Sequence, residues 1–343
     1  MPTAVPRIPL VHGPTPIVRM AALDALVGCR VHVKRDDMTG GAEAGNKLRK
    51  LEYFLADAQA NAATTLVTCG ALQSNHARAT ALVAARFGLR SLLLLRCTEG
   101  PTDPWTDADD LPAVGNVALA RLVGARIRKI SASDYRQRTA LLLESSQEID
   151  RNGGRGYVIP EGGSNGLGSL GYVRAAEEIA WQVRHGAVDA KRFAEIVVAC
   201  GSGGTVAGLA LGAARTDVYQ RVRAALVCDD ARYFEGVVRR IVQESRAWDD
   251  TLGDVVAPVL YDESSRGPRY GEMDPGQKDF LVDVARNTGL ILDPVYTGKA
   301  LYALRLARER RDLGPKDDVL FLHTGGLPGF LATAANLPLG GVR

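Results

Sequence analysis

The sequence predicts an α/β protein whose sheets are open, mainly parallel and covered by helices on both faces. Along most of the chain, short apolar segments of strand length alternate with longer segments in which apolar residues recur at helical spacing. This alternation is typical of parallel sheets joined by right-handed helical crossovers. The chain has 343 residues, 46% of them hydrophobic. It is therefore long enough for one large domain or two ordinary domains with ample core.

The first half of the chain alternates strands and helices in order. Residues 30–37 (RVHVKRDD) predict a strand, because Val31 and Val33 alternate with polar residues. After a glycine-rich loop, Leu48, Leu51 and Leu55 recur at helical spacing. Further strand–helix pairs are predicted at 64–70 and 76–88, 91–96 and 114–125, and 126–131 and 133–154.

The second half repeats the pattern. Strand–helix pairs are predicted at 157–163 and 168–186 and at 193–201 and 205–215, and a late helix and strand at 286–312 and 320–330. These late elements need a partner sheet formed earlier in the chain. The polar, proline-rich segment 101–116 predicts an irregular surface excursion between a strand and a helix.

Charge and cysteine content exclude several classes of function. The net charge is +3, from 42 basic and 39 acidic residues, and no basic stripe marks a nucleic-acid surface. No apolar run approaches the roughly 20 residues that cross a bilayer, so we expect a cytoplasmic protein with no membrane partner. The five cysteines are far apart, without a C-x-x-C pair, and predict no metal site.

Two glycine-rich loops were compared with phosphate-binding motifs. In GGAEAGNK, Lys47 comes one residue late for a Walker A loop and Leu48 replaces the required Ser or Thr. In GSGGTVAG, Val206 replaces the third glycine of the dinucleotide fingerprint. The second loop still joins a strand to a helix, and glycine amides at a helix N-terminus bind a single phosphate, with Thr205 adding a hydroxyl. A tight turn without a ligand is the alternative.

Lys47 and Lys50 lie three residues apart where a glycine loop meets a helix, so both can face one cavity. A solvent-exposed basic face is the alternative. Ser74 and His76 follow the next strand, at the same carboxyl edge of a parallel sheet, where ligands bind. A nucleophilic lysine needs its pKa lowered by burial or by a neighbouring cation, which Lys50 could provide. A phosphate loop, a reactive lysine and a polar turn together indicate pyridoxal 5'-phosphate.

Six segments together resemble the D-cysteine desulfhydrase and 1-aminocyclopropane-1-carboxylate deaminase family. They are GNKLRKLEYFLADA, GALQSNHAR, PEGGSNGLGSLGY, GSGGTVAGLALG, ILDPVYTGKALYAL and LFLHTGGLPG. The members of this family are pyridoxal-phosphate enzymes of the tryptophan synthase β type, fold type II. The resemblance implies a large cofactor domain at 1–50 and 168–343, a small inserted domain at 51–167, a site between them and a homodimer.

The resemblance also assigns roles to residues. It makes Lys47 the Schiff-base lysine and Lys50 a phosphate ligand, and it places Asn75 at the phenolic oxygen of the cofactor. The implied phosphate loop is Gly201, Ser202, Gly203, Gly204 and Thr205. The implied substrate-binding residues are Gln73, Ser74, Asn75 and His76, and the implied catalytic residues are Lys47, Ser74, Tyr270 and Tyr296.

Two threonines indicate the desulfhydrase branch of the family. In the deaminases a glutamate stands at the position of Thr297 and an apolar residue at that of Thr324, so the resemblance implies that one or both hydroxyls meet the pyridine nitrogen. The alternative for Thr297 is an ordinary cap of the helix that follows it. Segments 101–110 and 228–250 match the family poorly, and we expect them to be surface decoration; the alternative is that they reshape the cleft.

The activity implied is β-elimination from a small amino acid, with D-cysteine giving pyruvate, hydrogen sulfide and ammonia. The alternatives are 1-aminocyclopropane-1-carboxylate deamination, cysteate sulfo-lysis and elimination from another β-substituted alanine. Outside catalysis, the alternative is a silent protein that binds an amino acid or the cofactor.

Overall fold

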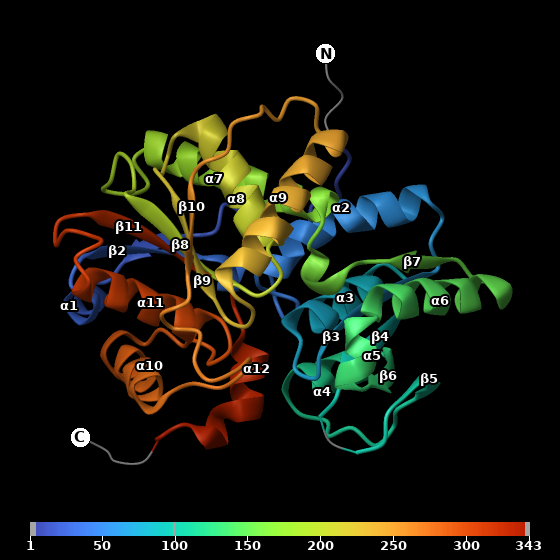
Figure 1. The fold of residues 1–343 in the computed structure, drawn as a ribbon. Coiled ribbons are helices and arrows are strands. Elements are labelled where there is room, and N and C mark those ends of the chain that lie inside the picture. Colours follow the sequence, from blue (N-terminus) through green and yellow to red (C-terminus); the bar gives the residue numbers. More distant parts are fainter. Residues whose placement is uncertain (1–4, 99, 340–343) are drawn as a thin grey trace.

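The computed structural model describes residues 5–98 and 100–339, which fold into two β-sheets with helices on both faces of each (Figure 1). The larger sheet lies in the left half of Figure 1 and the smaller sheet in the right half. The predicted α/β class is confirmed. Among the described residues, no helix is long and apolar enough to cross a membrane.

The larger sheet is parallel except at one edge, where β1 runs antiparallel to β2. Its strands in spatial order are β1 (Ile17–Arg19), β2 (Arg30–Arg35), β11 (Asp318–His323), β8 (Glu195–Cys200), β9 (Val222–Leu226) and β10 (Val259–Asp262). The last strand of the chain, β11, thus inserts between β2 and β8. This is the partner sheet that the late elements of the sequence require.

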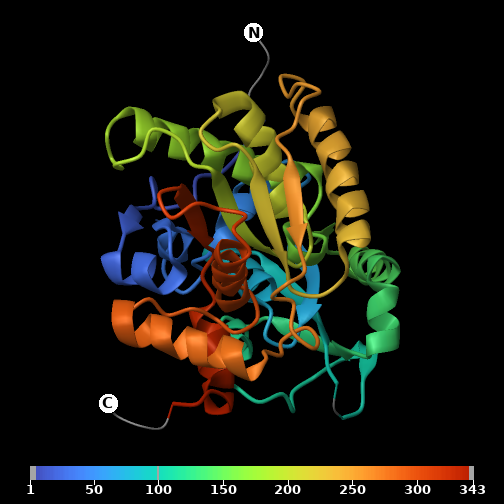
Figure 2. The same ribbon diagram turned by 60° about the vertical axis from the view of Figure 1, so that its left-hand side comes forward.

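Helices cover both faces of the larger sheet and bury two separate apolar clusters against it. One face carries α2 (Asn46–Ala60), α7 (Gly166–Arg184), α8 (Gly204–Thr216) and α9 (Ala231–Trp248), and the other carries α1 (Ala21–Val27), α10 (Pro275–Thr288) and α11 (Thr297–Glu309). In Figure 2 the blue helix α1 and the orange helix α10 lie together, and the gold helix α9 lies across the strands from them.

The smaller sheet is also parallel, except for its edge strand β5. Its strands in spatial order are β5 (Asp103–Asp107), β6 (Arg126–Ile130), β4 (Arg90–Arg96), β3 (Thr65–Ala71) and β7 (Gly156–Val158). Helices α3 (Asn75–Arg86) and α4 (Gly115–Leu122) cover one face, and α5 (Ala132–Arg136) and α6 (Arg138–Arg151) cover the other. Segment 101–116 is therefore not wholly irregular, because β5 pairs with β6.

The strands of the smaller sheet all lie inside the small domain predicted at 51–167. The predicted boundary after residue 50 falls within α2, and α2 packs in the same apolar cluster as α7 and α8 of the larger sheet. The domain limits stay a prediction. The remaining elements are α12 (Leu327–Thr333) and the 3-10 helices Asp36–Met38, Glu161–Gly163 and Ala334–Asn336.

Candidate active site

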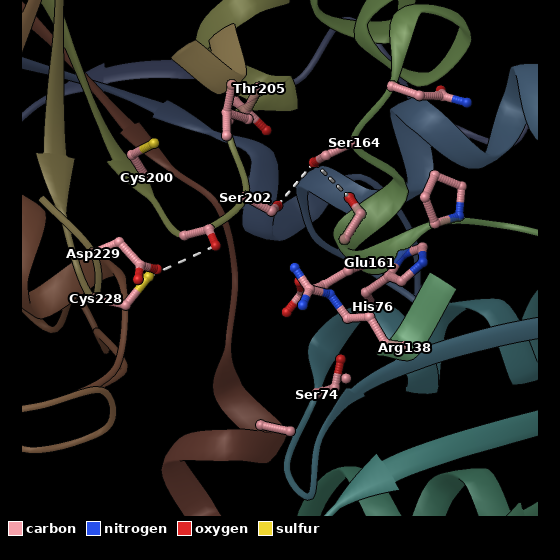
Figure 3. A pocket seen from close by; sticks show the side chains of 18 of the residues that line it. Ser74, His76, Arg138, Glu161, Ser164, Cys200, Ser202, Thr205, Cys228 and Asp229 are labelled. Atoms are coloured by element: carbon pink, nitrogen blue, oxygen red, sulfur yellow. Dashed lines mark hydrogen bonds and ion pairs between the residues drawn. The ribbon is translucent and has the colours of Figure 1, made fainter. Parts of the chain in front are cut away.

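A cavity of about 1040 Å³ lies between the two sheets and takes its lining from both. Residues at or just after the carboxyl ends of β3, β4, β7 and β8 reach it, as expected for parallel sheets. Figure 3 shows Ser202 and Thr205 on one side of this space and Ser74, His76 and Glu161 on the other. The cavity is thus where the sequence motifs from distant parts of the chain meet.

The predicted phosphate loop joins β8 to α8 and lines one wall of the cavity. Gly203 has a φ of +82°, which residues with a side chain rarely adopt, and it directly precedes the first turn of α8. The first N–H groups of a helix have no intrahelical partner, so they are free to bind an anion. Ser202 Oγ lies 2.8 Å from Ser164 Oγ, whose own position is fixed by the N–H of Gly204 at 3.2 Å (Figure 3).

Lys47 lies in the first turn of α2 and lines the cavity. Burial lowers the pKa of Lys47 to about 8, and the charge of Glu161 acts in the opposite direction. The sequence suggested that Lys50 could lower this pKa, but burial is what lowers it, and the charge of Lys47 instead lowers the pKa of Lys50. A substantial fraction of the Lys47 amine is therefore neutral and nucleophilic near physiological pH.

Lys50 is completely buried and does not line the cavity. Its Nζ donates hydrogen bonds to the carbonyl oxygen of Gly162 at 3.0 Å and to Ser164 Oγ at 3.2 Å. A Cβ built on Gly204 would lie 3.0 Å from that Nζ. Burial and the charge of Lys47 hold the pKa of Lys50 well below its usual value. The structure thus places Lys50 behind the phosphate loop, one helical turn from Lys47.

The N-terminus of α3 forms the opposite wall. Ser74 caps this helix by accepting a hydrogen bond from the N–H of Ala77 at 3.1 Å. Asn75 Oδ1 accepts one from Asn116 Nδ2 at 3.0 Å, and both Ser74 and Asn75 line the cavity. Gln73 does not line it, because its Oε1 accepts the N–H of Asn116 at 2.8 Å. Three of the predicted substrate residues, Ser74, Asn75 and His76, thus reach the cavity.

His76 is buried, and its Nε2 lies 3.0 Å from Thr68 Oγ1. Burial and the charges of Lys47 and Lys50 hold the pKa of His76 well below its usual value. The imidazole is therefore neutral at physiological pH. Its Nδ1 has no hydrogen-bond partner among the described residues.

Tyr270 and Tyr296 meet on the side of the cavity formed by the larger sheet, with their hydroxyl oxygens 2.5 Å apart. Tyr296 is the N-cap residue of α11, whereas Tyr270 lies in the loop between β10 and α10. Burial raises the pKa of Tyr270 to about 12 and raises that of Tyr296 well above its usual value. Both hydroxyls are therefore protonated at neutral pH and can donate.

The two threonines of interest behave differently. Thr324 follows β11 and lines the cavity. Thr297 does not, and it is completely buried. Its hydroxyl donates to Asp293 Oδ2 at 2.7 Å and accepts the N–H of Asp293 at 2.7 Å. These bonds run back to Asp293, and Tyr296, not Thr297, is the N-cap residue of α11, so the alternative of an ordinary helix cap is wrong. They leave Thr324 to face a ligand.

Sequence reasoning missed a cluster on the outer side of the cavity. Tyr135 donates a hydrogen bond to Glu161 Oε1 at 2.5 Å, and Arg138 Nε lies 2.9 Å from Glu161 Oε2. The guanidinium of Arg96 lies 5.2 Å from the ring centre of Tyr135 and 5.5 Å from that of Tyr270. Arg96 ends β4 and Glu161 follows β7, so the rule that selected Ser74 would have selected both.

Segment 228–250 is not surface decoration, and that expectation is wrong. Helix α9 occupies most of it and contributes Tyr233, Val237 and Arg240 to the cavity lining. Cys228 lines the cavity too, as does Cys200, and neither is in a disulfide bond. One of the two segments that match the family poorly therefore shapes one wall of the site.

The residues of this cavity fit pyridoxal phosphate. The glycine loop at the start of α8 provides an anion cradle, and a Cβ on Gly201 would lie only 3.1 Å from Tyr296 Cε1. The buried amine of Lys47 lies in the same cavity. Among residues 5–98 and 100–339, no group of three or more His, Cys, Asp or Glu side chains is placed to hold a metal ion.

Comparison with known proteins agrees with this fit. Residues 8–325 match the family model described as pyridoxal-phosphate dependent enzyme. The chain is 39% identical over 324 residues to a bifunctional D-cysteine desulfhydrase/1-aminocyclopropane-1-carboxylate deaminase of Arabidopsis thaliana, covering 93% of this chain and 78% of the relative. It is also 39% identical to a D-cysteine desulfhydrase of Serratia proteamaculans, covering 95% and 96% of the two chains.

A crystal structure of an ACC deaminase homologue superimposes with a TM-score of 0.84 at 34% identity, covering 97% of this chain and 95% of that one. The fold class expected from the sequence, that of fold type II pyridoxal-phosphate enzymes, is thereby confirmed. From the cavity, its lysine and these relatives it follows that the chain belongs to the family of pyridoxal-phosphate-dependent enzymes.

Proposed function

We propose that this enzyme is a lyase that eliminates the β-substituent of a small amino acid, with D-cysteine as its substrate. The Cα proton and the Cβ–S bond are lost, and the resulting enamine takes up water to give pyruvate and ammonia, with hydrogen sulfide as the third product. The two relatives at 39% identity carry this activity in their names.

One observation carries the proposal: a lysine base and a pair of protonated tyrosines line the same cavity. Elimination needs a group that removes the Cα proton and a group that protonates the departing thiolate. Lys47, with its pKa lowered to about 8, suits the first task. The hydroxyls of Tyr270 and Tyr296, 2.5 Å apart, suit the second, because each can pass its proton to the other.

Several residues would hold the cofactor in this arrangement. Lys47 would bind it covalently, the loop from Gly201 to Thr205 would bind its phosphate, and Asn75 its phenolic oxygen. When bound, pyridoxal phosphate supplies an electron sink for negative charge at the substrate Cα. Ser74 and the N-terminus of α3 would bind the substrate carboxylate, because the hydroxyl of Ser74 and the positive end of the helix dipole both favour an anion.

Thr324 supports the desulfhydrase branch over ring opening of 1-aminocyclopropane-1-carboxylate. A neutral hydroxyl beside the pyridine nitrogen leaves that nitrogen largely unprotonated, which suits the elimination of a good leaving group. Thr324 lines the cavity and can take this position, whereas Thr297 is bonded to Asp293.

The proposal is tested by assaying keto-acid release from a substrate panel. The panel is D-cysteine, L-cysteine, cysteate, 3-chloroalanine and 1-aminocyclopropane-1-carboxylate. We expect D-cysteine to give pyruvate and sulfide in equal amounts. If only the cyclopropane substrate is turned over, with 2-oxobutyrate as the product, the desulfhydrase assignment fails while the cofactor assignment remains.

The arginines on the outer side of the cavity, which we call the outer wall, favour a second substrate that carries a negative charge. Arg96, Arg136 and Arg138 all line the cavity, and Glu161 pairs only with Arg138 in this group. The excess positive charge suits an amino acid whose β-substituent is an anion, such as the sulfonate of cysteate. The variant Arg96→Gln should then lower kcat/KM for cysteate more than for 3-chloroalanine, which is neutral in its side chain. An equal loss for both substrates would remove this candidate.

We also propose a homodimer, as the family resemblance implies. Helices α4 and α12 pack against each other, and both carry exposed leucines, Leu122 on α4 and Leu327 and Leu331 on α12. Exposed apolar patches mark protein interfaces, and these leucines are the candidates for one. Light scattering that gives the mass of a single chain would remove this proposal. The cytoplasmic location stays a prediction from the sequence.

A further inference from the structure

A buried cation near the tyrosine pair has no part in the function described so far. The side chain of Lys299 is fully buried in the first turn of α11. Its Nζ donates hydrogen bonds to two backbone carbonyl oxygens, that of Arg266 at 2.6 Å and that of Arg269 at 3.2 Å. No carboxylate of the described residues lies within ion-pair distance of this ammonium.

This is an unfavourable place for a positive charge. The N-terminal end of a helix carries a partial positive charge of its own, which disfavours cations in the first turn. Burying an ion that has no carboxylate in direct contact is also costly, and replacing buried ionic groups by apolar side chains of similar size is often neutral or stabilising. Stability of the fold alone therefore does not account for a lysine at position 299.

The two carbonyls belong to the loop between β10 and α10, which contains Tyr270. Gly267, between the two acceptors, has a φ of +71°, and a Cβ on it would lie 3.3 Å from Lys299 Nζ. On the other side, Gln277 Nε2 donates to the carbonyl oxygen of Ser265 at 2.8 Å. The backbone of residues 266–269 thus lies against the ammonium, and Gln277 holds the preceding residue.

The helix that carries Lys299 also carries Tyr296 at its N-cap. Lys299 therefore joins the two segments that supply the tyrosine pair. It lies three residues after Tyr296 and bonds the carbonyl oxygen of Arg269, the residue before Tyr270. The hydroxyl oxygens of Tyr270 and Tyr296 are 2.5 Å apart, and hydrogen bonds between hydroxyls span only about 2.5 to 3.0 Å. A loop displacement of roughly 1 Å would separate the two hydroxyls.

We propose that Lys299 is a positioning residue: it clamps the backbone of loop 263–273 and so holds the hydroxyl of Tyr270 against that of Tyr296. This inference rests on the role of the tyrosine pair in the proposed elimination. The charged ammonium is the form with three donors. Burial lowers the pKa of Lys299 to about 8, while the negative charges that face it, Asp274, Asp293 and Glu272, and the thiol of Cys228 act in the opposite direction.

A double-mutant cycle on the holoenzyme tests the proposal. Lys299→Met and Tyr270→Phe should each lower kcat, by about 10²-fold for the tyrosine change, with KM altered much less. Because Lys299 acts through Tyr270, adding Lys299→Met to Tyr270→Phe should cause no further loss. Lys278→Met, on the neighbouring helix α10, is the matched control and should leave kcat unchanged. Additive losses, or an unchanged kcat in Lys299→Met, overturn the proposal.

Amide hydrogen exchange provides a readout that needs no substrate. Exchange at residues 264–272 should speed up in Lys299→Met and stay unchanged in Lys278→Met. An unchanged loop overturns the clamp, even if the enzyme turns over a substrate other than D-cysteine. If Lys299→Met does not fold, Lys299→Gln, which keeps one amide donor, takes its place in both experiments. If no substrate of the panel is turned over but exchange at residues 264–272 speeds up in Lys299→Met, the proposed function fails and the clamp stands.

Discussion

The two sides of the active-site cavity are built from different groups. The side of the larger sheet offers backbone amides and small hydroxyls in the glycine loop from Gly201 to Thr205 at the start of α8, with the tyrosine pair on the same side. The side of the smaller sheet offers large charged and aromatic side chains, among them Arg96, Tyr135 and Glu161. A backbone cradle suits a phosphate that is the same in every turnover, whereas side chains can discriminate between amino acids. Phosphate binding is thus assigned to the larger sheet, and recognition of the substrate's charged groups to the smaller one.

Removing the lysine where the two sides meet should have the largest effect. In Lys47→Ala we expect no cofactor to be fixed to the chain by borohydride, and turnover to fall by about 10⁴-fold, because both the covalent attachment and the base are lost. Mass spectrometry of peptides after reduction measures the first, and pyruvate release the second. Lys278→Ala is the control, and cofactor fixed to another lysine in Lys47→Ala would refute the assignment.

The lowered pKa of Lys47 predicts how the rate of cofactor attachment to the cofactor-free protein depends on pH. After removal of the cofactor, only the neutral amine attacks the aldehyde of pyridoxal phosphate. With a pKa of about 8, the neutral fraction and hence the attachment rate should rise roughly 50-fold from pH 6 to pH 8 and then level off. Absorbance during reconstitution follows this rate. A rate that keeps rising tenfold per pH unit up to pH 10 would show that burial does not lower this pKa.

Two threonine substitutions should separate cofactor contact from fold stability. Thr324→Val should lower turnover about tenfold and alter the absorbance of the bound cofactor, with little change in melting temperature. Thr297→Val should leave the cofactor spectrum unchanged and lower the melting temperature, because it removes the hydroxyl that donates to Asp293 Oδ2 and leaves the N–H of Asp293 without its acceptor, at a cost of about 1 to 3 kcal/mol of stability. Thermal melts beside spectra of each holoenzyme measure both. The reverse result would move the contact with the ring from Thr324 to Thr297.

The smallest effect is expected on the backbone-rich side. Thr205→Ala should weaken cofactor binding about fivefold, since it removes one hydroxyl and leaves the backbone amides in place. Thr216→Ala, at the other end of α8, is the matched control. Gly203 is a poorer probe, because a side chain at φ +82° and 2.8 Å from Val237 Cγ1 would strain the fold as well. A fall in cysteate selectivity in Thr205→Ala would contradict the division between the two sides.

The sequence was most informative where a local pattern fixes the backbone. The strand–glycine–helix pattern located the loop at 201–205 and the helix that carries Lys47, because turns and helix starts depend on neighbouring residues. Spacing alone did not distinguish Thr324 from Thr297, since the direction of a hydroxyl depends on its hydrogen-bond partner. Nor did it place Lys50, which lies on the same helix face as Lys47 but one turn deeper, behind the loop.

The residues of the outer wall could not be predicted from local sequence patterns, because they come from segments far apart in the chain. Tyr135 and Arg138 come from α5 and α6, Glu161 from the turn after β7, and Tyr233 from α9, and only the assembled sheets bring these segments together. The carboxyl-end rule for parallel strands identifies the positions of Arg96 and Glu161 once the strand order is known. The same rule says nothing of side chains that reach the cavity from helices on the faces of a sheet.

The most direct test of the proposed chemistry is a comparison of two substrates with the unaltered holoenzyme. D-cysteine and 1-aminocyclopropane-1-carboxylate are supplied at equal concentrations in separate assays, and sulfide, pyruvate and 2-oxobutyrate are measured. The cavity with Lys47, the tyrosine pair and Thr324 predicts equal release of sulfide and pyruvate from D-cysteine and little or no 2-oxobutyrate. Robust 2-oxobutyrate formation with no turnover of D-cysteine would contradict it.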